Sequence, residues 1–554
     1  MNLLKKKSFY IILLIIMIFA AIAIWWYMKP FDGDINKDII VRIRKDQLPM
    51  SHNPLLYFKT DTLKLSEIGA AISECVFDGL YNRTIDSSNQ LSYEKGLAKR
   101  LWTEDSKYGV SKTWYIELKE KYWHGTNIKV TPLDIIHTYD CIDKGGSESP
   151  WRERLRQSIR ELPPISPSET KRIEIVFNTR MAKEDVVQLL TFKIIPQVFY
   201  YKDKKIKLLP GTMMNPHGDK NWKIFNQNPI GTGPYRINQK KSSDDRIVLE
   251  KDTTNTVDNN IPEHVIFREL SDEDLLSAIG KKINFLLYIP APYRNEITGN
   301  NNFSNYQYTP FYFYAIVFGK DISEESKNQI YSLMNENTKS NILSSLGIKN
   351  DNTKYINNGP FPWNWKIFIK YNKRKFSLQN VGEKSSKNSF VKHPIKLICN
   401  RNDIRTKDLT TLISNQLRNK FSIEITEMPE TKFMTSLKNK KYQLALIIWE
   451  GFDQDYSISK LYTEEGNPLN IISLDRTRMP YLNSLFDKLI TEKKINGCYT
   501  TAGEIHKLIN SEKPYIFLFT PPRTAAYINK IDGIEEFPVH PETFLPNIKY
   551  WKMR

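Results

Sequence analysis

The chain has 554 residues and a mass of 65.0 kDa. Single hydrophobic cores stop growing near about 250 to 300 residues, so we expect two or more lobes. Hydrophobic residues make up 40% and aromatic residues 12% of the chain, which argues against bulk disorder. The formal net charge of +18 is spread along the chain, with no long basic arm and no zinc-knuckle or RNP-like spacing. We therefore expect no nucleic acid among its partners.

The N-terminus carries an uncharged run of 20 residues at 9–28, which follows three lysines at 5–7. At a rise of about 1.5 Å per residue, this run matches the hydrocarbon thickness of a bilayer, roughly 30 Å. The lysines before it and the aromatic residues 25–27 at its end predict one transmembrane helix, a single-pass anchor in the cell membrane with the rest of the chain outside the cytoplasm. Ala21 and Ala23 leave a cleavable signal peptide as the alternative.

Hydrophobic periodicity predicts the first elements of the exported part. Apolar residues at helical spacing indicate a helix over 65–79, and alternation indicates a strand over 113–118. The sequence TPLD at 131–134 is typical of a helix start, with Thr as N-cap, Pro in the first turn and Asp at the capping-box position. A strand over 172–177 and a helix around 183–192 follow.

The second half of the chain alternates short apolar strands with helices. The predicted elements are strands at 395–399, 421–425 and 444–449 and helices at 409–417 and 433–437. The order β-α-β-α-β predicts a parallel sheet, because parallel neighbours need crossover connections. Such sheets bind ligands beyond the carboxyl ends of their strands, so residues 450–455 would lie near a ligand. Residues 370–392, rich in Lys, Ser and Asn, predict an exposed loop or insertion.

The sequence carries none of the common catalytic or cofactor motifs. GxSxG, a P-loop, HExxH, an EF-hand loop and a Gly-rich dinucleotide turn are all missing. Pro234 removes a backbone donor from the Gly-Thr-Gly-Pro turn at 231–234, which therefore cannot form a phosphate loop. The four cysteines are far apart and include no CxxC pair, which argues against a cysteine zinc site. We expect no enzyme activity, no cofactor and no metal.

Several separated stretches point to one family. They are LAKRLW at 97–102, TWYIEL at 113–118, YWHGT at 122–126, TPLDI at 131–135, NPIGTGPYRI at 228–237, YQLALIIW at 442–449 and the helix and strand at 504–519. In order and spacing they resemble the family 5 extracellular solute-binding proteins, the oligopeptide-, dipeptide- and nickel-binding components of ABC importers. The resemblance extends over roughly residues 36 to 545.

The resemblance implies an α/β, bilobed Venus-flytrap fold with an extra inserted domain, and the apolar run at 9–28 adds one N-terminal membrane helix to it. The implied boundaries are an anchor or signal peptide at 1–33, lobe I at 34–70, 195–305 and 525–554, the inserted domain at 71–194 and lobe II at 306–524. The implied function is to enclose a peptide or similar small ligand between the lobes by hinge closure and deliver it to ABC permease subunits, as a monomer. A non-transporting ligand sensor of the same fold and an exported hydrolase with a spatially assembled site are the alternatives.

The predicted ligand-binding residues are Trp449, Asp453, Asp455, Trp123, His52 and Met50. Each has a structural alternative: the tryptophans as core residues, the aspartates as solvated loop carboxylates, and the segment 50–54 as a simple turn. Peptide-binding members carry an Asp three residues after the tryptophan of the last strand, which pairs with the peptide amine, whereas Phe452 stands there in this chain. Two alternatives follow: a neighbouring carboxylate such as Asp453, one place later, takes over the amine contact, or the ligand lacks an amine.

Two further positions depart from the family pattern. Gly125 directly follows His124, where the family has an Asp between them, and Asn284 replaces an Asp. Gly231 and Gly233 are expected to be structural, in a turn beside the hinge, because glycine permits close backbone approach or positive φ.

Overall fold

The computed structural model describes residues 32 to 554 except 44–47, 50–51, 56–66, 86–90, 106–108, 145–150, 167–168, 213–218, 256–259, 310–311, 349–351, 364, 366–367, 369–374, 377–393, 402–403, 419, 451–453, 464–476, 493–494, 512, 514 and 535–546. The apolar run at 9–28 and most of the loop expected at 370–392 lie outside the described residues. Within the described part, no helix has both the length and the apolar character needed to cross a membrane.

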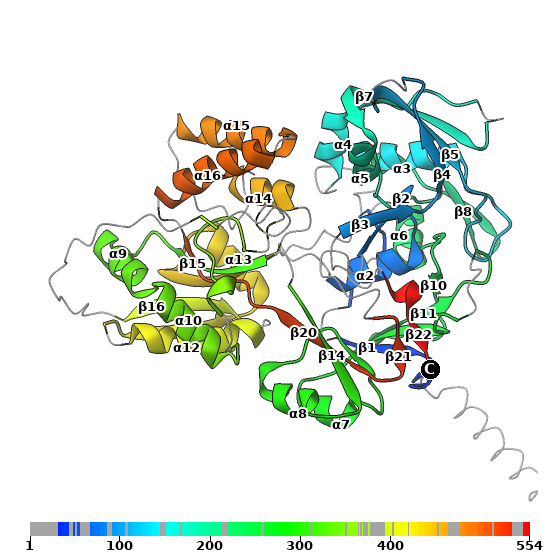
Figure 1. The fold of residues 1–554 in the computed structure, drawn as a ribbon. Helices are drawn as coiled ribbons and strands as arrows, with labels where there is room; N and C mark the ends of the chain where they lie inside the picture. The colour runs from blue at the N-terminus through cyan, green and yellow to red at the C-terminus, as the bar shows by residue number, and fades with distance from the viewer. Residues whose placement is uncertain are drawn as a thin grey trace, which may run out of the picture.

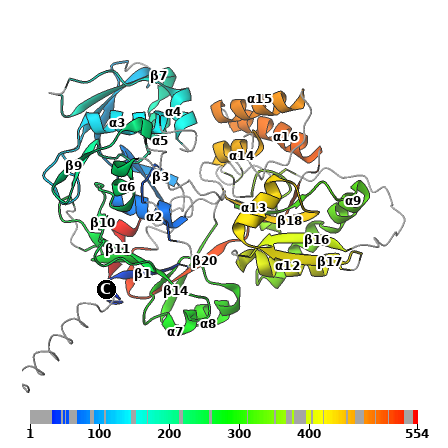
Figure 2. The same ribbon diagram turned by 180° about the vertical axis from the view of Figure 1, so that it is seen from behind.

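Two large sheets form two lobes that lie side by side (Figures 1 and 2). The sheet of lobe I has seven strands in the order β10 (Tyr235–Ile237), β11 (Arg246–Lys251), β12 (His264–Glu269), β1 (Ile39–Ile43), β13 (Phe285–Leu286), β20 (Arg523–Ile528) and β14 (Phe303–Tyr308). Every residue of β1 is buried, because both faces of the sheet are covered. Odd-numbered residues of β1 pack with α2 (Glu67–Val76), and Ile40 packs with α7 (Leu275–Ala278) and α8 (Arg294–Thr298).

Asn284 explains one departure from the family pattern. Its side chain is fully buried, and its Oδ1 accepts a hydrogen bond from the Ile40 backbone N–H at 2.7 Å. Its Nδ2 donates to the carbonyls of Asp38 at 2.7 Å and Ile35 at 3.2 Å. A carboxylate could only accept, so the amide suits this place, where one donor and one acceptor are needed.

A second body packs above lobe I, built on a four-stranded sheet in the order β4 (Ala98–Trp102), β5 (Val110–Leu118), β7 (Arg172–Ala182) and β6 (Ile159–Glu161). Two hairpins accompany this sheet, β2 (Tyr81–Ile85) with β3 (Leu91–Lys95) and β8 (Val198–Tyr201) with β9 (Lys204–Lys207). The helices in this part of the chain are α3 (Pro132–Lys144), α4 (Arg152–Ser158), α5 (Lys183–Leu189), η1 (Pro210–Thr212) and α6 (Lys220–Gln227). The predicted start of α3 is confirmed, because the Thr131 backbone N–H and hydroxyl donate to the Asp134 carboxylate at 2.9 and 3.1 Å.

Lobe II contains a five-stranded sheet in the order β17 (Ile423–Met428), β16 (Ile395–Asn400), β18 (Leu444–Glu450), β15 (Tyr312–Phe318) and β19 (Tyr515–Phe517). β16 runs parallel to both β17 and β18, and α12 (Ile404–Leu417) and α13 (Glu430–Lys438) connect them. The predicted β-α-β-α-β order is confirmed. The sheet as a whole is mixed, because β15 joins antiparallel to β18 and β19 antiparallel to β15.

The remaining elements complete lobe II and the C-terminal return. They are η2 (Ala291–Tyr293), α9 (Glu324–Leu333), α10 (Glu336–Ser345), η3 (Asn352–Tyr355), α14 (Gln454–Thr463), α15 (Arg478–Thr491), α16 (Ile495–Ser511), β21 (Ile531–Asp532), η4 (Ile548–Tyr550) and β22 (Lys552–Met553). The helices predicted at 65–79 and 183–192 are present as α2 and α5, which end earlier than predicted, at Val76 and Leu189. Among the described residues, none of the four cysteines forms a disulfide.

Candidate functional site

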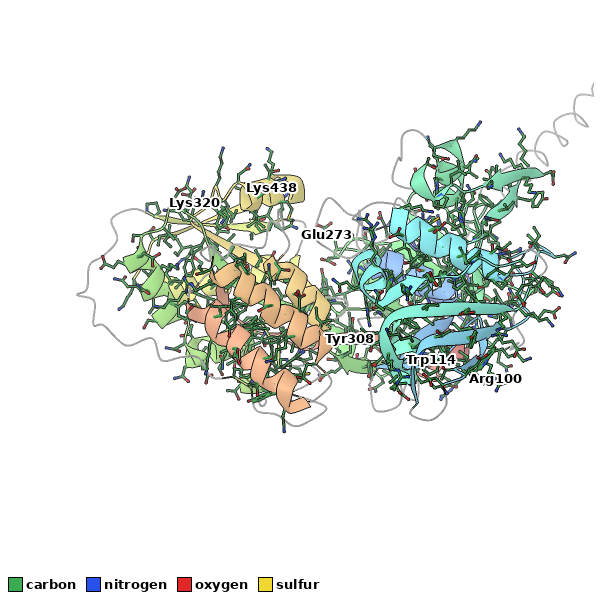
Figure 3. All side chains as sticks on the ribbon, turned by 90° about the horizontal axis from the view of Figure 1, so that it is seen from above. Arg100, Trp114, Glu273, Tyr308, Lys320 and Lys438 are labelled. Carbon is green, nitrogen blue, oxygen red and sulfur yellow. The ribbon has the colours of Figure 1, made fainter. Side chains whose placement is uncertain are left out.

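The chain passes twice between the two sheets. It leaves lobe I between Tyr308, the end of β14, and Tyr312, the start of β15, and it returns between Phe517 and Arg523. β14 and β20 pair with each other, with Tyr308 opposite Arg523, so the two passages lie side by side. Tyr308 stands between the two lobes in Figure 3. Any change in the angle between the lobes has to be absorbed at these two passages.

Hydrogen bonds fasten the two passages to each other. The Tyr312 hydroxyl donates to the Pro521 carbonyl at 2.6 Å, and the Thr520 hydroxyl donates to the Tyr312 carbonyl at 2.5 Å. The Trp363 indole N–H donates to the Thr520 carbonyl at 2.8 Å. The guanidinium of Arg523, which is 4% exposed, lies 4.8 Å from the centre of the Tyr312 ring. The hinge region is thus a buried, aromatic-rich strip with a cation in it.

Trp449 lies next to this strip, near the end of β18. Its partner across the sheet is Phe313, the second residue of β15, and the two ring centroids are 5.0 Å apart. Phe313 in turn contacts Phe517 of β19 edge to face, at 5.3 Å. Trp449 is 6% exposed and belongs to the core on the α14 to α16 side of the sheet. The structure therefore places it at the lobe II end of the passages, with its ring packed inside.

For three of the predicted site residues, the structure describes either no atoms or only the backbone. Asp453 and Met50 lie outside the described residues. Asp455 is the second residue of α14, and its side chain is not described. The helix begins within a few residues of the carboxyl end of β18, the end of the sheet at which Tyr312 pairs with Glu450. The ligand roles of these three residues stay predictions.

His52 is held in lobe I by the end of α6. Its backbone N–H donates to the Asn226 carbonyl at 2.9 Å, and the next residue, Asn53, donates from its side-chain amide to the Asn226 side chain at 3.1 Å. The Nδ1 atom of His52 is buried and has no hydrogen-bond partner among the described residues. Burial lowers the pKa of His52 to about 4, so the imidazole is neutral at pH 7. A neutral ring with one open nitrogen suits a polar group of a ligand.

Trp123 lies inside the second body. It is 2% exposed, and its indole donates a hydrogen bond to the carboxylate of Asp134 at the start of α3. Burial raises the pKa of Asp134 in spite of this bond. The surroundings of Trp123 correspond to the alternative of packing under the following helix, and its ligand role stays a prediction.

The YWHGT motif at 122–126 and the Gly-Thr-Gly-Pro turn at 231–234 are joined by hydrogen bonds. The His124 Nδ1 accepts from the Gly231 backbone N–H at 3.2 Å, and its Nε2 lies 2.9 Å from the Gly233 carbonyl, so Nε2 carries the proton. Burial lowers the pKa of His124 and keeps the ring neutral. A Cβ added at Gly231 would lie 1.9 Å from the Val76 carbonyl oxygen, which confirms the structural role through close backbone approach.

The location of this turn differs from the expectation. The turn at 231–234 leads into β10, which forms one edge of the lobe I sheet, whereas β14, the strand that leads into the hinge, forms the other edge. The turn therefore does not lie beside the hinge. Sequence spacing could not reveal this, because the position of β10 follows from strand order alone. The turn instead fastens the second body to lobe I through α2 and His124.

Asp78 is the centre of a buried polar network beside this turn. It is 5% exposed and accepts hydrogen bonds from Lys121 at 2.6 Å, Thr232 at 3.1 Å and Asn82 at 2.7 Å. A second buried ion pair joins Lys193 to Glu74 at 2.6 Å, and Lys193 also reaches Asn82 at 3.3 Å. The network connects α2, β2 and the motif turn, and the sequence offered only the acidic end of the predicted helix at 65–79 as a signal for it.

Neither a family model nor a curated protein matches the chain. Solved structures do, and among the most similar is the ABC transporter substrate-binding protein CtaP from Listeria monocytogenes, at 16% identity over 94% of this chain and 100% of that chain, with a TM-score of 0.68. NikZ from Campylobacter jejuni, in complex with Ni(L-His), matches at 17% identity over 94% and 100%, with a TM-score of 0.67. The oligopeptide-binding protein AppA from Bacillus subtilis, in complex with a nonapeptide, matches at 14% identity over 94% and 100%, with a TM-score of 0.66. The bilobed α/β fold predicted from the sequence is confirmed.

Proposed function

We propose that the chain is the substrate-binding protein of an ABC importer of family 5, a binding protein without enzyme activity, which encloses a peptide or similar small ligand between its lobes. The observation that carries the proposal is the pair of adjacent chain passages between the lobes, in a fold that matches substrate-binding proteins over their whole length. Hinge motion at two neighbouring passages opens and closes such a protein around a ligand. The importer permease is the partner that receives the ligand.

The proposed binding region comprises the ends of the strands beside the passages. In this proposal Trp449 at the end of β18, Asp453 and Asp455 contribute from lobe II, and His52, whose buried Nδ1 has no hydrogen-bond partner among the described residues, contributes from lobe I. Met50 belongs to the same lobe I segment, and Trp123 extends the region towards the second body. The matched structures bind a nonapeptide in one case and Ni(L-His) in another, so ligand class depends on side chains rather than on the fold.

The proposed location is outside the cytoplasm, tethered to the cell membrane by the apolar run at 9–28. The substrate-binding proteins that match the chain support export of the folded part. The tether is tested by mass determination of the membrane fraction: a retained anchor gives the full-length mass of 65.0 kDa, and cleavage near Ala23 gives a shorter soluble chain.

Native mass spectrometry of the purified full-length chain tests the function. A peptide mixture retained by the purified chain would support peptide binding. After this mixture has been removed by partial unfolding and dialysis, a defined peptide pool should raise the melting temperature of the chain. An Asp453→Asn variant should bind amine-bearing ligands at least tenfold more weakly if the charge pair is buried. Asp140→Asn, on the exposed side of α3, is the matched control and should bind unchanged. The absence of both retained ligand and peptide stabilisation would rule out peptide specificity.

A further inference from the structure

Three arginines form a row across neighbouring strands of lobe I. Arg42 on β1 pairs in register with Arg268 on β12, and Arg268 pairs in register with Arg246 on β11. Register partners point to the same face of a sheet and lie about 5 Å apart. This is the face that carries α7 and α8, since Ile40, two residues before Arg42, packs there. The three guanidinium groups therefore line one side of the sheet.

The row is buried, whereas Asp32 and Asp245, two of the carboxylates that pair with it among the described residues, are exposed. The side chains of Arg42, Arg246 and Arg268 are 4%, 6% and 11% exposed. Arg42 pairs with Asp272, which is 17% exposed, and also donates from Nε and Nη2 to the Leu270 carbonyl at 3.2 and 3.1 Å. Its positive charge is thus compensated inside the protein.

Asp32 serves the other two arginines from the solvent side. Its carboxylate contacts Arg268 and lies 3.3 Å from Nη1 of Arg246, and its side chain is 55% exposed. Arg246 also meets Asp245, which is 54% exposed, at 3.3 Å. Partial burial acts to raise the pKa of Asp32, but hydrogen bonds and attraction from Arg268 and Arg246 outweigh it and hold the pKa below its ordinary value. An exposed carboxylate on a buried pair of guanidiniums is open to exchange with another anion.

Arg268 retains donor capacity that Asp32 does not use. Its Nη1 is buried and has no hydrogen-bond partner among the described residues. A buried guanidinium N–H without an acceptor is costly, and a tetrahedral anion with several oxygens could satisfy it together with Arg246. Planar guanidinium groups match phosphate geometry with two parallel hydrogen bonds, which a lysine cannot provide.

We propose that Arg268 and Arg246, beside the internally compensated Arg42, form a phosphate-type anion site on lobe I, for which the Asp32 carboxylate is a built-in competitor. Asp32 follows Met28, the last residue of the apolar run, by four residues, a span of at most about 14 Å. A phospholipid headgroup beside a membrane-embedded run and a free phosphate group offer the same chemistry to the site. The site itself does not depend on the proposed import function.

Calorimetric titration of the full-length chain, in non-ionic detergent, with inorganic phosphate tests the site. We expect one phosphate to bind per chain. The Asp32→Asn variant should bind phosphate about tenfold more tightly, because it lacks the Asp32 carboxylate, which competes with phosphate at a millimolar effective concentration. Arg268→Gln and Arg246→Gln should each abolish binding. Arg236→Gln, on the adjacent strand β10 and 45% exposed, is the matched control and should bind phosphate as the unchanged chain does. Circular dichroism checks that each variant is folded.

Nanodiscs separate the two sources of phosphate. Both lipids carry a phosphodiester, so if a headgroup occupies the site, phosphatidylglycerol and phosphatidylcholine nanodiscs should both slow hydrogen exchange in β11 and β12 relative to phosphate-free non-ionic detergent, and Arg268→Gln should remove the protection. If free phosphate is the ligand, neither nanodisc should protect these strands unless phosphate is added. The proposal is overturned if neither the unchanged chain nor Asp32→Asn binds phosphate, or if binding survives in both folded arginine variants.

Discussion

The molecule contains two joints of opposite character. The second body is fastened to lobe I by buried charges and by direct backbone contact: Asp78 binds Lys121, Glu74 binds Lys193, and Gly231 lies against α2. Lobe II is connected to lobe I by two passages that are held to each other by hydroxyl groups donating to backbone carbonyls, Tyr312 to Pro521 and Thr520 to Tyr312. Buried ion pairs tolerate little displacement, whereas two adjacent extended passages can rotate about a few backbone angles. Buried ion pairs thus hold one joint, whereas hydrogen bonds to backbone carbonyls hold the other.

Removing the Asp78 carboxylate should have the largest effect. Asp78→Ala leaves Lys121, 23% exposed, without its ion-pair partner and two further donors without their acceptor. We expect a loss of about 3 to 5 kcal/mol in the free energy of unfolding, measured by urea denaturation. Asp140→Ala, which removes a surface pair with Lys144, should cost less than about 0.5 kcal/mol. Similar losses in the two variants would contradict a charge-fixed joint.

Crowding the backbone contact should have the next largest effect. In Gly231→Ala the new Cβ would collide with the Val76 carbonyl, a backbone atom that cannot move aside alone. We expect a loss of about 3 kcal/mol, read from the shift of the denaturation midpoint. The same substitution at Gly211 meets open space and is the matched control. If Gly231→Ala proved as stable as Gly211→Ala, the close approach would not fix this joint.

The free energy of unfolding should fall in mild acid, in part through His124 at the fixed joint. Burial lowers the pKa of His52 and His137 to about 4 and lowers that of His124. The unfolded chain binds protons below about pH 6.5 while the folded chain does not, so the free energy of unfolding falls as pH drops from 6.5 towards 4, by up to about 1.4 kcal/mol per pH unit for each histidine. Denaturation curves at several pH values measure the slope. His124→Gln should have a shallower slope, and an unchanged slope would exclude its contribution.

A single substitution in the passages between the lobes should have the smallest effect on the free energy of unfolding. Tyr312→Phe removes the donor to the Pro521 carbonyl but keeps the ring under Arg523. The expected loss is about 1 kcal/mol. Tyr481→Phe, whose hydroxyl binds exposed Glu504, serves as control and should not change stability measurably. Small-angle scattering should find that Tyr312→Phe still closes on ligand, since closure depends on backbone rotation; failure to close would assign the hydroxyl a direct part in the hinge.

Local patterns predicted local structure well and long-range contacts poorly. The capping bond of Asp134 and the parallel order of β16, β17 and β18 follow from periodicity and from residue types a few positions apart. The contact between His124 and Gly231 joins residues 107 positions apart, and no periodicity encodes such a distance. Arg523 and Tyr312 were missed for the same reason, because strand order brings them together.

Strand order gives the position of the strand ends but not of ligand contacts. The carboxyl end of β18 lies beside the first passage between the lobes, and ligand contact by the residues after Trp449 stays a prediction. The ring of Trp449 nevertheless packs on Phe313, since an aromatic residue at a sheet end can cover the core and adjoin a ligand region at once. Sequence spacing does not distinguish these two orientations.

The position of β20 also determines the order in which the chain can fold. β14 is an edge strand whose neighbour in the sheet is β20, and β20 begins at Arg523, after all of lobe II has been made. During synthesis or export from the N-terminus, β14 must wait for this late strand while residues 312–517 can already form their own sheet. Such non-local pairing slows folding and leaves an unpaired strand edge exposed. A chaperone that binds extended segments would therefore find its target in lobe I, at β14, rather than in lobe II.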